Sequence, residues 1–289
     1  MKLVFFENQG CLDTYNKPIT REDKREFVNL LQCKRGLKRN DLPVFSAIDT
    51  LKIALKLHGD QLVLGWSGGK CSTIVLHMAL KLKPDIKVIF TNTGVEFPEN
   101  VKYVRKVTNL WNVNLTELKP DTSFWKIVEE YGFPQIQSKS YRQKRQSWNK
   151  NQDKKPMCCF LLKELKRFAF YKEHNITGDI GGLRACESRT RAIHIGRMGM
   201  IYYVKRGMVT YHPIALWNKR KCEKYLEDNK IPFNETYITQ NRNGCWACTA
   251  YIGWKNNLLK YSPKMYEFLR KKMRKKQGPL DTLLKVKKL

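Results

Sequence analysis

The sequence predicts an α/β protein built on a mostly parallel, five-stranded sheet that is flanked by helices. Three observations lead to this fold class. A short apolar run, a stretch of helical periodicity and a second apolar run follow one another between residues 61 and 90. The same alternation continues to residue 276, and a glycine pair, Gly68-Gly69, separates the first apolar run from the helix behind it. Strand, helix, strand units of this kind form parallel sheets with right-handed crossovers.

The expected elements follow in order along the chain. Apolar residues within 48–57 repeat with a helical period, and that helix ends near Gly59. Residues 61–66 and 86–90 are apolar runs of the buried-strand type, and 72–82 carries a helical pattern between them. Further strands are expected over 113–118, 176–179 and 209–214, and further helices over 123–131, 160–172, 219–229 and 263–276.

A chain of 289 residues is long enough for one hydrophobic core with additions. We expect a basic accessory segment over 1–45, a main α/β domain over 46–240, and a C-terminal segment over 241–289 that includes a basic helix. The longest apolar stretches fall well short of the ~20 residues that cross a bilayer, and no secretory cleavage pattern follows the N-terminus. We therefore expect a cytoplasmic protein without membrane association.

The charge balance indicates a polyanionic partner. The 55 Lys and Arg residues against 26 Asp and Glu leave a formal net charge of +29. Such a charge favours nucleic acid and makes the binding depend on salt. The alternative is a lysine-rich, heat-adapted surface, although such surfaces also gain Glu. In residues 138–156, Tyr141 and Trp148 stand among cations, which fits either a nucleic-acid contact or an ordinary solvated insertion.

Ser67-Gly68-Gly69-Lys70 has the composition of a phosphate-binding loop, and it lies between a buried strand and the start of a helix. Glycine lets backbone N–H groups turn toward an anion, and the helix N-terminus adds partial positive charge. The hydroxyls of Ser72 and Thr73 are further donors, and the ammonium of Lys70 would offset phosphate charge. A simple turn is the alternative interpretation.

Four of the nine cysteines form two close pairs. Cys158 and Cys159 are adjacent, and Cys245 and Cys248 form a C-x-x-C pair. Four thiolates suit zinc or an iron-sulfur cluster, and buried structural thiols are the alternative. Metal or redox chemistry in a reducing compartment fits this spacing better than disulfides do.

Three single cysteines accompany the expected nucleotide site. Cys71 opens the helix after the glycine pair, where the helix N-terminus and Lys70 are expected to lower its pKa. It would then carry a persulfide, unless it is only a small packing residue. Cys186 and Cys222 are further candidates, for which structural roles are favoured.

Four stretches resemble motifs of one family, in the order that the family has them. Residues 67–72 look like the SGGxDS pyrophosphatase loop of the adenine nucleotide alpha-hydrolase (PP-loop) superfamily. Residues 90–98 resemble the DTGxxFPE element of the phosphoadenylylsulfate (PAPS) reductase family, 182–191 its GxRxxES motif, and 212–217 its PxxxW element. The resemblance implies a Rossmann-like, five-stranded sheet that binds ATP with Mg²⁺ at the carboxyl ends of its strands.

The resemblance also assigns residues to roles. It implies catalytic roles for Lys70, Cys71 and Arg184, and two guanidinium groups suit phosphate because each binds it with paired hydrogen bonds. Cys71 stands where the loop usually has Asp, and Asn92 where an acid is frequent, so one Mg²⁺ contact is lost. The paired cysteines are similar to those that bind a [4Fe-4S] cluster in adenylylsulfate reductases, which implies the ligands Cys158, Cys159, Cys245 and Cys248. The implied nucleotide-binding residues are Ser67, Gly68, Gly69, Lys70, Ser72, Thr73, Thr91, Asn92, Thr93, Gly94, Arg184 and Arg191.

One departure from the family decides the expected activity. Sulfonucleotide reductases carry a catalytic cysteine in a C-terminal Glu-Cys-Gly motif, and no cysteine follows Cys248 here. The expectation is an ATP-dependent sulfur-transfer enzyme with a [4Fe-4S] cluster that adenylylates nucleic acid, with DNA preferred to tRNA as the substrate. It would resemble the ATP pyrophosphatase of DNA phosphorothioation (DndC or SspD type) and take sulfur from a cysteine desulfurase or another donor protein. The alternatives are a PAPS or adenylylsulfate reductase that borrows another thiol, and a non-catalytic nucleic-acid-binding module.

Overall fold

The computed structural model describes residues 44–134, 157–204, 207–240, 243–251 and 253–276. Most of the expected accessory segment over 1–45, and the basic loop over 138–156, lie outside the described residues. The chain divides into two compact units that alternate along the sequence. The first unit is Met1–Phe90, Val104–Glu117 and Ala169–Phe233, and the second is Thr91–Tyr103, Leu118–Phe168 and Asn234–Leu289.

A mostly parallel sheet of six strands forms the frame, in the order β3-β2-β1-β4-β6-β5. Strand β1 pairs in parallel with β2 and β4, and β4 pairs in parallel with β6. The side chains of Leu62, Val63 and Leu64 on β1 are almost fully buried, as a central strand of a covered sheet requires. The strands are β1 Leu62–Gly65, β2 Lys87–Thr91, β3 Leu115–Leu118, β4 Gly178–Ile180, β5 Ile201–Val204 and β6 Met208–Tyr211.

The predicted number of five strands is wrong, because β5 was missed. The five expected strands correspond to β1, β2, β3, β4 and β6. The sixth, Ile-Tyr-Tyr-Val at 201–204, is a run of β-branched and aromatic residues with strong strand propensity. It pairs antiparallel with β6, and Gly207 between them has a φ of 80°, which suits a hairpin turn.

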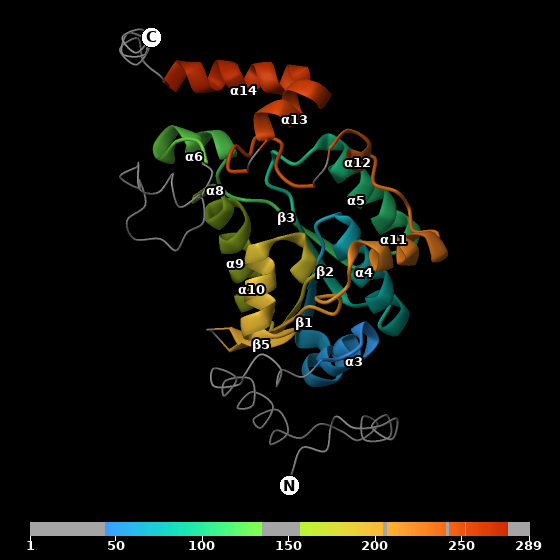
Figure 1. Ribbon diagram of the computed structural model, residues 1–289. Helices are drawn as coiled ribbons and strands as arrows, with labels where there is room; N and C mark the ends of the chain where they lie inside the picture. The colour runs from blue at the N-terminus through green and yellow to red at the C-terminus, as the bar shows by residue number, and fades with distance from the viewer. Residues whose placement is uncertain (1–43, 135–156, 205–206, 241–242, 252, 277–289) are drawn as a thin grey trace. The chain divides into compact units, whose positions relative to one another are not determined.

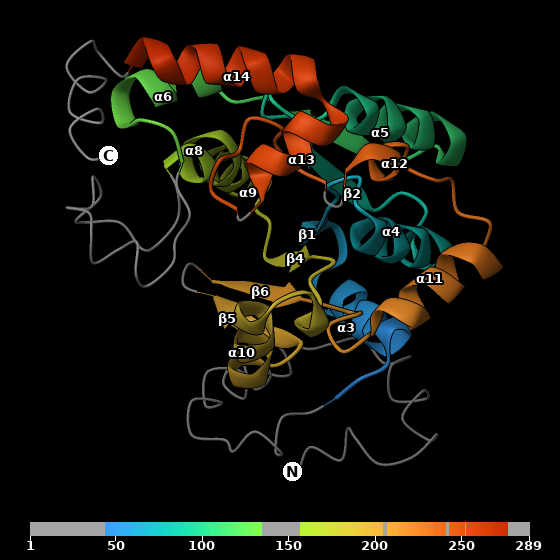
Figure 2. The same cartoon turned by 45° about the horizontal axis from the view of Figure 1, so that its top comes forward.

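Among the helices of the first unit, α3 packs against the three neighbouring strands β1, β4 and β6. Helix α3 begins after Ser46, whose side chain accepts a hydrogen bond from the Asp49 N–H, and ends at Gly59 with a φ of 52°. Helices α4 and α11 pack against each other, and Figures 1 and 2 both draw α10 beside β5. These elements are α3 Ala47–His58, α4 Lys70–Leu82, α10 Arg189–Met198, α11 Lys219–Asp228 and the short 3₁₀ turns Gly59–Gln61 and Ala185–Glu187.

The second unit has a helical core of its own. Buried apolar side chains from distant parts of the chain meet there, among them Phe97, Phe124, Leu162 and Leu258. Helices α13 and α14 follow one another and pack together (Figure 1). The elements of this unit are α6 Phe124–Tyr131, α8 Met157–Cys159, a π-helical turn Phe160–Glu164, α12 Thr236–Thr239, α13 Trp254–Tyr261 and α14 Pro263–Lys276. Two further helices, α5 Pro98–Trp111 and α9 Leu165–Glu173, each begin in the second unit and end in the first.

All six expected helices are confirmed: five of them agree within two residues at either end, and the one expected over 160–172 consists of the π-helical turn Phe160–Glu164 and α9. Helices α5, α8, α10, α12 and α13 were not expected. In the part of the chain that the structure describes, no helix has the length and apolar character needed to span a bilayer.

Candidate active site

The glycine loop lies where β1 passes into α4. Gly68 has a φ of 73°, a conformation that other residues rarely adopt, so glycine is required at this turn. Gly69 is the N-cap of α4 and makes no side-chain capping hydrogen bond, and the partial positive charge of a helix N-terminus favours an anion. The sequence therefore folds into the geometry that the phosphate-loop interpretation needs.

Hydroxyl groups hold this loop from inside. The Ser67 and Ser72 hydroxyl oxygens lie 3.0 Å apart, and the hydroxyls of Ser72 and Thr73 each donate to the Gly69 carbonyl at 3.0 Å. Trp66 Nε1 donates to the Thr73 hydroxyl at 3.0 Å. The Thr73 hydroxyl thus has its donor and acceptor roles taken within the protein.

The backbone at Gly182, shortly after β4, lies very close to the backbone of Cys71 and Ser72 in the first turn of α4. A β-carbon placed on Gly182 would lie 2.6 Å from the backbone nitrogen of Ser72 and 2.8 Å from the carbonyl carbon of Cys71. No side chain fits at those distances, so glycine at 182 is needed for the two backbones to meet. The residues that follow Gly182 are thereby brought beside the first turn of α4.

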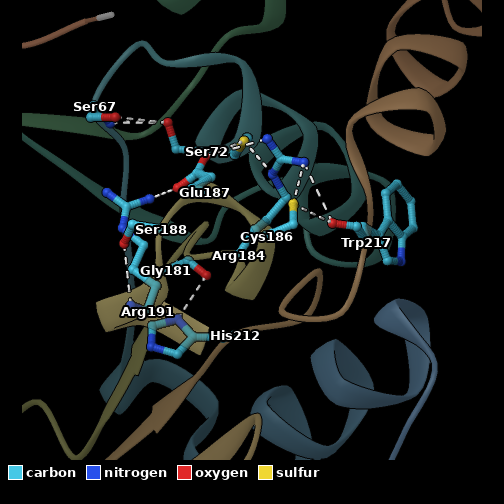
Figure 3. Close-up of polar contacts among 11 residues, drawn as sticks. Ser67, Ser72, Gly181, Arg184, Cys186, Glu187, Ser188, Arg191, His212 and Trp217 are labelled. Atoms are coloured by element: carbon cyan, nitrogen blue, oxygen red, sulfur yellow. Dashed lines mark hydrogen bonds and ion pairs between the residues drawn. The ribbon is translucent and has the colours of Figure 1, made fainter. Parts of the chain in front are cut away.

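Arg184 stands at the centre of a group of thiols. Its Nε donates to Cys71 Sγ at 3.0 Å and its Nη1 donates to Cys186 Sγ at 3.2 Å. The Cys186 thiol in turn donates to the Trp217 carbonyl at 3.2 Å. Figure 3 shows the guanidinium with dashed contacts to sulfur and to the Trp217 carbonyl oxygen, to which Nη1 donates at 3.4 Å. The residue is 9% exposed, so this cation is buried against sulfur.

A second thiol lies against Cys71. Cys71 and Cys222 are joined by a hydrogen bond, and this bond, together with burial, raises the pKa of the Cys71 thiol despite the charge of Arg184. The expectation of a lowered pKa for Cys71 is therefore wrong. The same hydrogen bond and the Arg184 charge lower the pKa of Cys222 below its usual value, against the effect of burial. Of the two thiols, Cys222 is therefore the one that loses its proton more readily.

Glu187 connects the thiol group to a second arginine. It accepts from the Cys71 thiol at 3.2 Å and pairs with Arg184 Nη2 at 3.4 Å. It also pairs with Arg191, one turn further along the chain. Both arginines expected to bind phosphate therefore share one carboxylate, which an incoming anion would have to replace.

A buried histidine, His212, holds the backbone at Gly181, next to Gly182. His212 Nδ1 lies 3.1 Å from the Gly181 carbonyl, so this nitrogen must donate, and Nε2 accepts from the Tyr202 hydroxyl at 3.1 Å. Burial lowers the pKa of His212, which keeps the ring neutral. The contact fixes the backbone just before Gly182 (Figure 3).

The second unit contains the paired cysteines around a different cation. Cys245 Sγ lies 3.4 Å from the Thr93 hydroxyl and 3.5 Å from Glu96 Oε1. Lys163 Nζ pairs with the same Glu96 oxygen at 3.2 Å. Although burial opposes its charge, the pKa of Lys163 is raised by the nearby Cys245, Glu96 and Cys159. Burial raises the pKa of Cys245 to about 11.

All four paired cysteines belong to one neighbourhood. The pKa of the Cys158 thiol is raised by a hydrogen bond with Cys159, by burial, and by Cys248 and Cys245. Cys158 lies in the apolar core of the unit, with Cys159 and Cys245 packed against that core. Nevertheless, among the described residues no three Cys, His, Asp or Glu side chains are arranged as ligands of a metal ion.

The structure separates the expected nucleotide-binding residues into the two units. Those at 67–73, with Arg184 and Arg191, belong to the first unit. Thr91, Asn92, Thr93 and Gly94 belong to the second, where Asn92 Oδ1 accepts from the Gly94 N–H and Thr93 contacts Cys245. Sequence analysis missed Glu96 and Gly182, although both lie inside quoted motifs, because a motif does not say which side chains meet.

A parallel sheet whose glycine loop opens the helix behind its first strand defines a nucleotide-binding α/β fold. Residues 61–251 match the model of the phosphoadenosine phosphosulfate reductase domain, and the chain belongs to this family. The resemblance seen in the motifs is thereby confirmed.

Individual relatives agree with this membership. An uncharacterized protein from Methanocaldococcus jannaschii is 30% identical over 228 residues, which are 77% of this chain and 43% of that protein. The chain thus spans less than half the length of this relative. An adenosine 5'-phosphosulfate reductase from Halalkalibacterium halodurans is 26% identical over 80% of this chain and 90% of its own length. The crystal structure of a PAPS reductase from Candida auris shares the fold, with a TM-score of 0.54 and 19% identity over 80% of this chain and 98% of that one.

Proposed function

We propose that this chain is a sulfonucleotide reductase, in which the loop of the first unit binds an adenylylated sulfate and Cys71 attacks the sulfur. The observation that carries the proposal is the position of the Cys71 thiol in the first turn of α4, directly after the glycine loop and 3.0 Å from Arg184 Nε. The relatives named adenosine 5'-phosphosulfate reductase, such as that of Halalkalibacterium halodurans, support the same activity.

Binding would use the backbone and the two arginines. The partial positive charge at the N-terminus of α4 favours an anion, and the positive φ of Gly68 lets the backbone approach it. Arg184 and Arg191 now share Glu187, and the oxygens of a bound phosphosulfate would take over these guanidinium contacts. The fold thus supplies the charge that an anionic nucleotide needs without the carboxylate that usually stands at position 71.

The reaction would be a displacement at sulfur. The pKa of the Cys71 thiol is raised, so its deprotonation needs a base, and Glu187, which accepts the hydrogen bond of this thiol at 3.2 Å, is the carboxylate placed to take the proton. The sulfur of Cys71 then bonds to the sulfate sulfur, the bond from that sulfur to the phosphate oxygen breaks, and AMP leaves with the electron pair. Arg184 beside the reacting thiolate stabilises its negative charge. The product on the protein is S-sulfocysteine, from which a second thiol releases sulfite.

Sulfite formation tests the proposal. The protein, purified without oxygen, is incubated with adenosine 5'-phosphosulfate or its 3'-phosphorylated form and dithiothreitol, and sulfite and the released nucleotide are measured. The proposal predicts equal amounts of both products from at least one of the two substrates. Absence of sulfite from both, with the substrate shown to bind, would overturn it.

A second function is favoured by the net charge of +29. It is the ATP-dependent transfer of sulfur to nucleic acid, DNA before tRNA, with a cysteine desulfurase or similar protein as donor. The loop would then bind ATP with Mg²⁺, and the basic surface would hold the polyanion. Release of pyrophosphate from ATP that depends on added DNA or tRNA, with no sulfite from sulfonucleotides, would make this the better account.

The paired cysteines of the second unit fit an iron-sulfur cluster in the chemistry of their donor atoms. Four soft thiols lie in one neighbourhood, and Lys163 supplies a cation to offset the negative charge of such a cluster. Cys158, Cys159, Cys245 and Cys248 would hold the iron once their thiols are deprotonated, and a bound [4Fe-4S] cluster supplies redox capacity. Iron and acid-labile sulfide in a ratio of one to one, in protein purified without oxygen, would support the cluster; bound zinc without sulfide would contradict it.

A further inference from the structure

Two cysteines of the first unit, distant in sequence, meet where two helices pack. Cys71 lies in the first turn of α4 and Cys222 in the first half of α11, and these helices pack against each other (Figures 1 and 2). The Cys222 residue is 3% exposed, and both cysteines are free. The contacts of His77 Nδ1 with the Tyr225 hydroxyl at 3.0 Å and of Lys81 Nζ with Asn229 Oδ1 at 3.1 Å set the two helices side by side in the same direction, which brings the turn of Cys222 beside the N-terminal part of α4. Two free thiols brought together by helix packing beside a nucleotide loop have the geometry of a redox pair.

We infer that Cys71 and Cys222 form a dithiol pair in which Cys71 takes the sulfo group and Cys222 releases it as sulfite by closing a disulfide. The inference rests on the proposed sulfonucleotide reductase function and adds the thiol that completes the reaction. It gives a reductive role to a buried cysteine that belongs to no motif of the family described above.

The second step balances without a further reactant. Cys222 sulfur bonds to the sulfur of Cys71, the bond between Cys71 sulfur and the sulfo group breaks, and sulfite leaves with that electron pair. The proton on Cys222 leaves with it as hydrogen sulfite. Two thiols are oxidised to one disulfide while sulfate sulfur is reduced by two electrons to sulfite. An external dithiol then reduces the disulfide by exchange at the more exposed sulfur, that of Cys71.

The surroundings favour Cys222 over the other nearby thiol. Cys186 is exposed, and its thiol donates to the Trp217 carbonyl at 3.2 Å, away from Cys71. The Arg184 guanidinium contacts Cys71 with Nε and Cys186 with Nη1, so the two sulfurs bind different edges of the same cation. Cys222 lies on α11, which packs against α4, and a hydrogen bond with Cys71 and the positive charge of Arg184 lower the pKa of its thiol against the effect of burial.

The test is a single turnover without external thiol. Protein reduced with dithiothreitol, freed of it and kept without oxygen, receives adenosine 5'-phosphosulfate in slight excess. Products are measured, and peptides are mapped by mass spectrometry after free thiols are blocked. The expected result is one AMP and one sulfite for each chain, with the Cys71 and Cys222 peptides cross-linked. AMP release with S-sulfocysteine persisting on Cys71 until a thiol is added, or a cross-link from Cys71 to Cys186, would overturn the inference.

Matched variants sharpen the result. Cys222→Ser should release one AMP and no sulfite in the absence of external thiol, and should accumulate S-sulfocysteine at Cys71. Cys186→Ser should still give the cross-link between Cys71 and Cys222. Thermal unfolding establishes that each variant is folded, and Cys222→Ala replaces the serine variant if a hydroxyl is not tolerated at this buried position. Sulfite release by Cys222→Ser at the wild-type yield would contradict the pair.

A failure of the underlying function is recognised separately. If neither AMP nor sulfite forms from sulfonucleotides, the reductase proposal fails, and this inference fails with it. If both products form with dithiothreitol but the cross-link is absent in single turnover, only the dithiol pair fails. Oxidation of the substrate-free protein with diamide gives an independent reading, since the pair predicts a Cys71 to Cys222 disulfide before any other among the described cysteines.

Discussion

The two units gather cysteines in contrasting ways. In the first, Cys71 and Cys186 come from separate elements and meet at one guanidinium, beside a helix N-terminus. In the second, the cysteines come as two pairs close in sequence and lie against an apolar core. Thiols beside the proposed anion site are placed to react with a bound substrate. Paired thiols against an apolar core are instead placed for a structural role or for binding a metal. The same residue type therefore serves two different ends in one chain.

The two units also differ in the cation that lies beside their thiols, which is Arg184 in the first unit and Lys163 in the second. Arg184 contacts two sulfur atoms with different nitrogens of its planar group, which fixes their directions. Lys163 forms an ion pair with Glu96 at 3.2 Å, and its pKa is raised by nearby thiols and that carboxylate despite burial. A guanidinium orients neighbouring groups, while an ammonium mainly balances charge. This contrast leads to predictions that assign chemistry to the first unit and structure to the second.

The largest effect is expected from Cys71→Ser. A serine hydroxyl does not replace a thiolate as a nucleophile toward sulfur, so sulfite formation should fall by about 10⁴-fold or more. The affinity for AMP, measured by calorimetry, should change less than about threefold, because Cys71 contacts Arg184 and Glu187 rather than closing the loop. Unchanged sulfite formation in this variant would show that Cys71 is not the nucleophile.

Cys158→Ser should affect the second unit alone. Cys158 is buried in the apolar core, so a hydroxyl there should cost about 1–3 kcal/mol of unfolding free energy. The iron and sulfide content of protein purified without oxygen should fall by more than half. Denaturant unfolding and metal analysis measure the two effects, and AMP binding reports on the first unit. Loss of AMP affinity with retained iron would contradict the assignment of Cys158 to the iron site of the second unit.

Two glycine substitutions separate close packing from backbone strain. Gly182→Ala in the first unit places a β-carbon 2.6 Å from the Ser72 nitrogen, and we expect about 1–3 kcal/mol of destabilisation together with weaker AMP binding. Gly253→Ala in the second unit meets no atom within 4 Å but forces a φ of 84°, and should cost only about 1 kcal/mol. Equal losses of AMP affinity in both variants would mean that the close packing of Gly182 against α4 does not contribute to AMP binding.

The smallest effect is expected from acid. All five histidines of the chain lie in segments of the first unit, and burial lowers the pKa of His212, His194 and His77. Because the unfolded chain takes up these protons at about pH 6.5, their contribution to stability is complete above that pH and is lost as pH falls toward the folded values. The protection factors of the amide hydrogens, which correct for the slower intrinsic exchange at lower pH, should therefore fall in β5 and β6 before α13 and α14 on going from about pH 7.5 to about pH 5.5. A simultaneous fall of the protection factors in both units would contradict this.

The sequence predicted the sheet well because buried strands are apolar runs between turn residues, as at Leu62 to Gly65. It missed β5, a four-residue strand that pairs with β6 only through the hairpin between them. The loop glycines were recognisable for a local reason, since Gly68 needs a positive φ. The contact between Cys71 and Cys222 was not recognisable, because single cysteines 151 positions apart leave no spacing pattern and meet only through the packing of α4 and α11. The lowered pKa expected for Cys71 failed for the same reason, since the neighbour that reverses it is distant in sequence.

The central claim is that an adenylylated sulfate binds at the first turn of α4 with its sulfur facing Cys71. A crystal structure of the Cys71→Ser protein with adenosine 5'-phosphosulfate tests this most directly. The account predicts the phosphate at the backbone N–H groups of residues 68–71, Arg184 on its oxygens, and the sulfate sulfur about 3.0–3.5 Å from the serine oxygen. A nucleotide bound elsewhere, or a sulfate group turned away from residue 71, would contradict it.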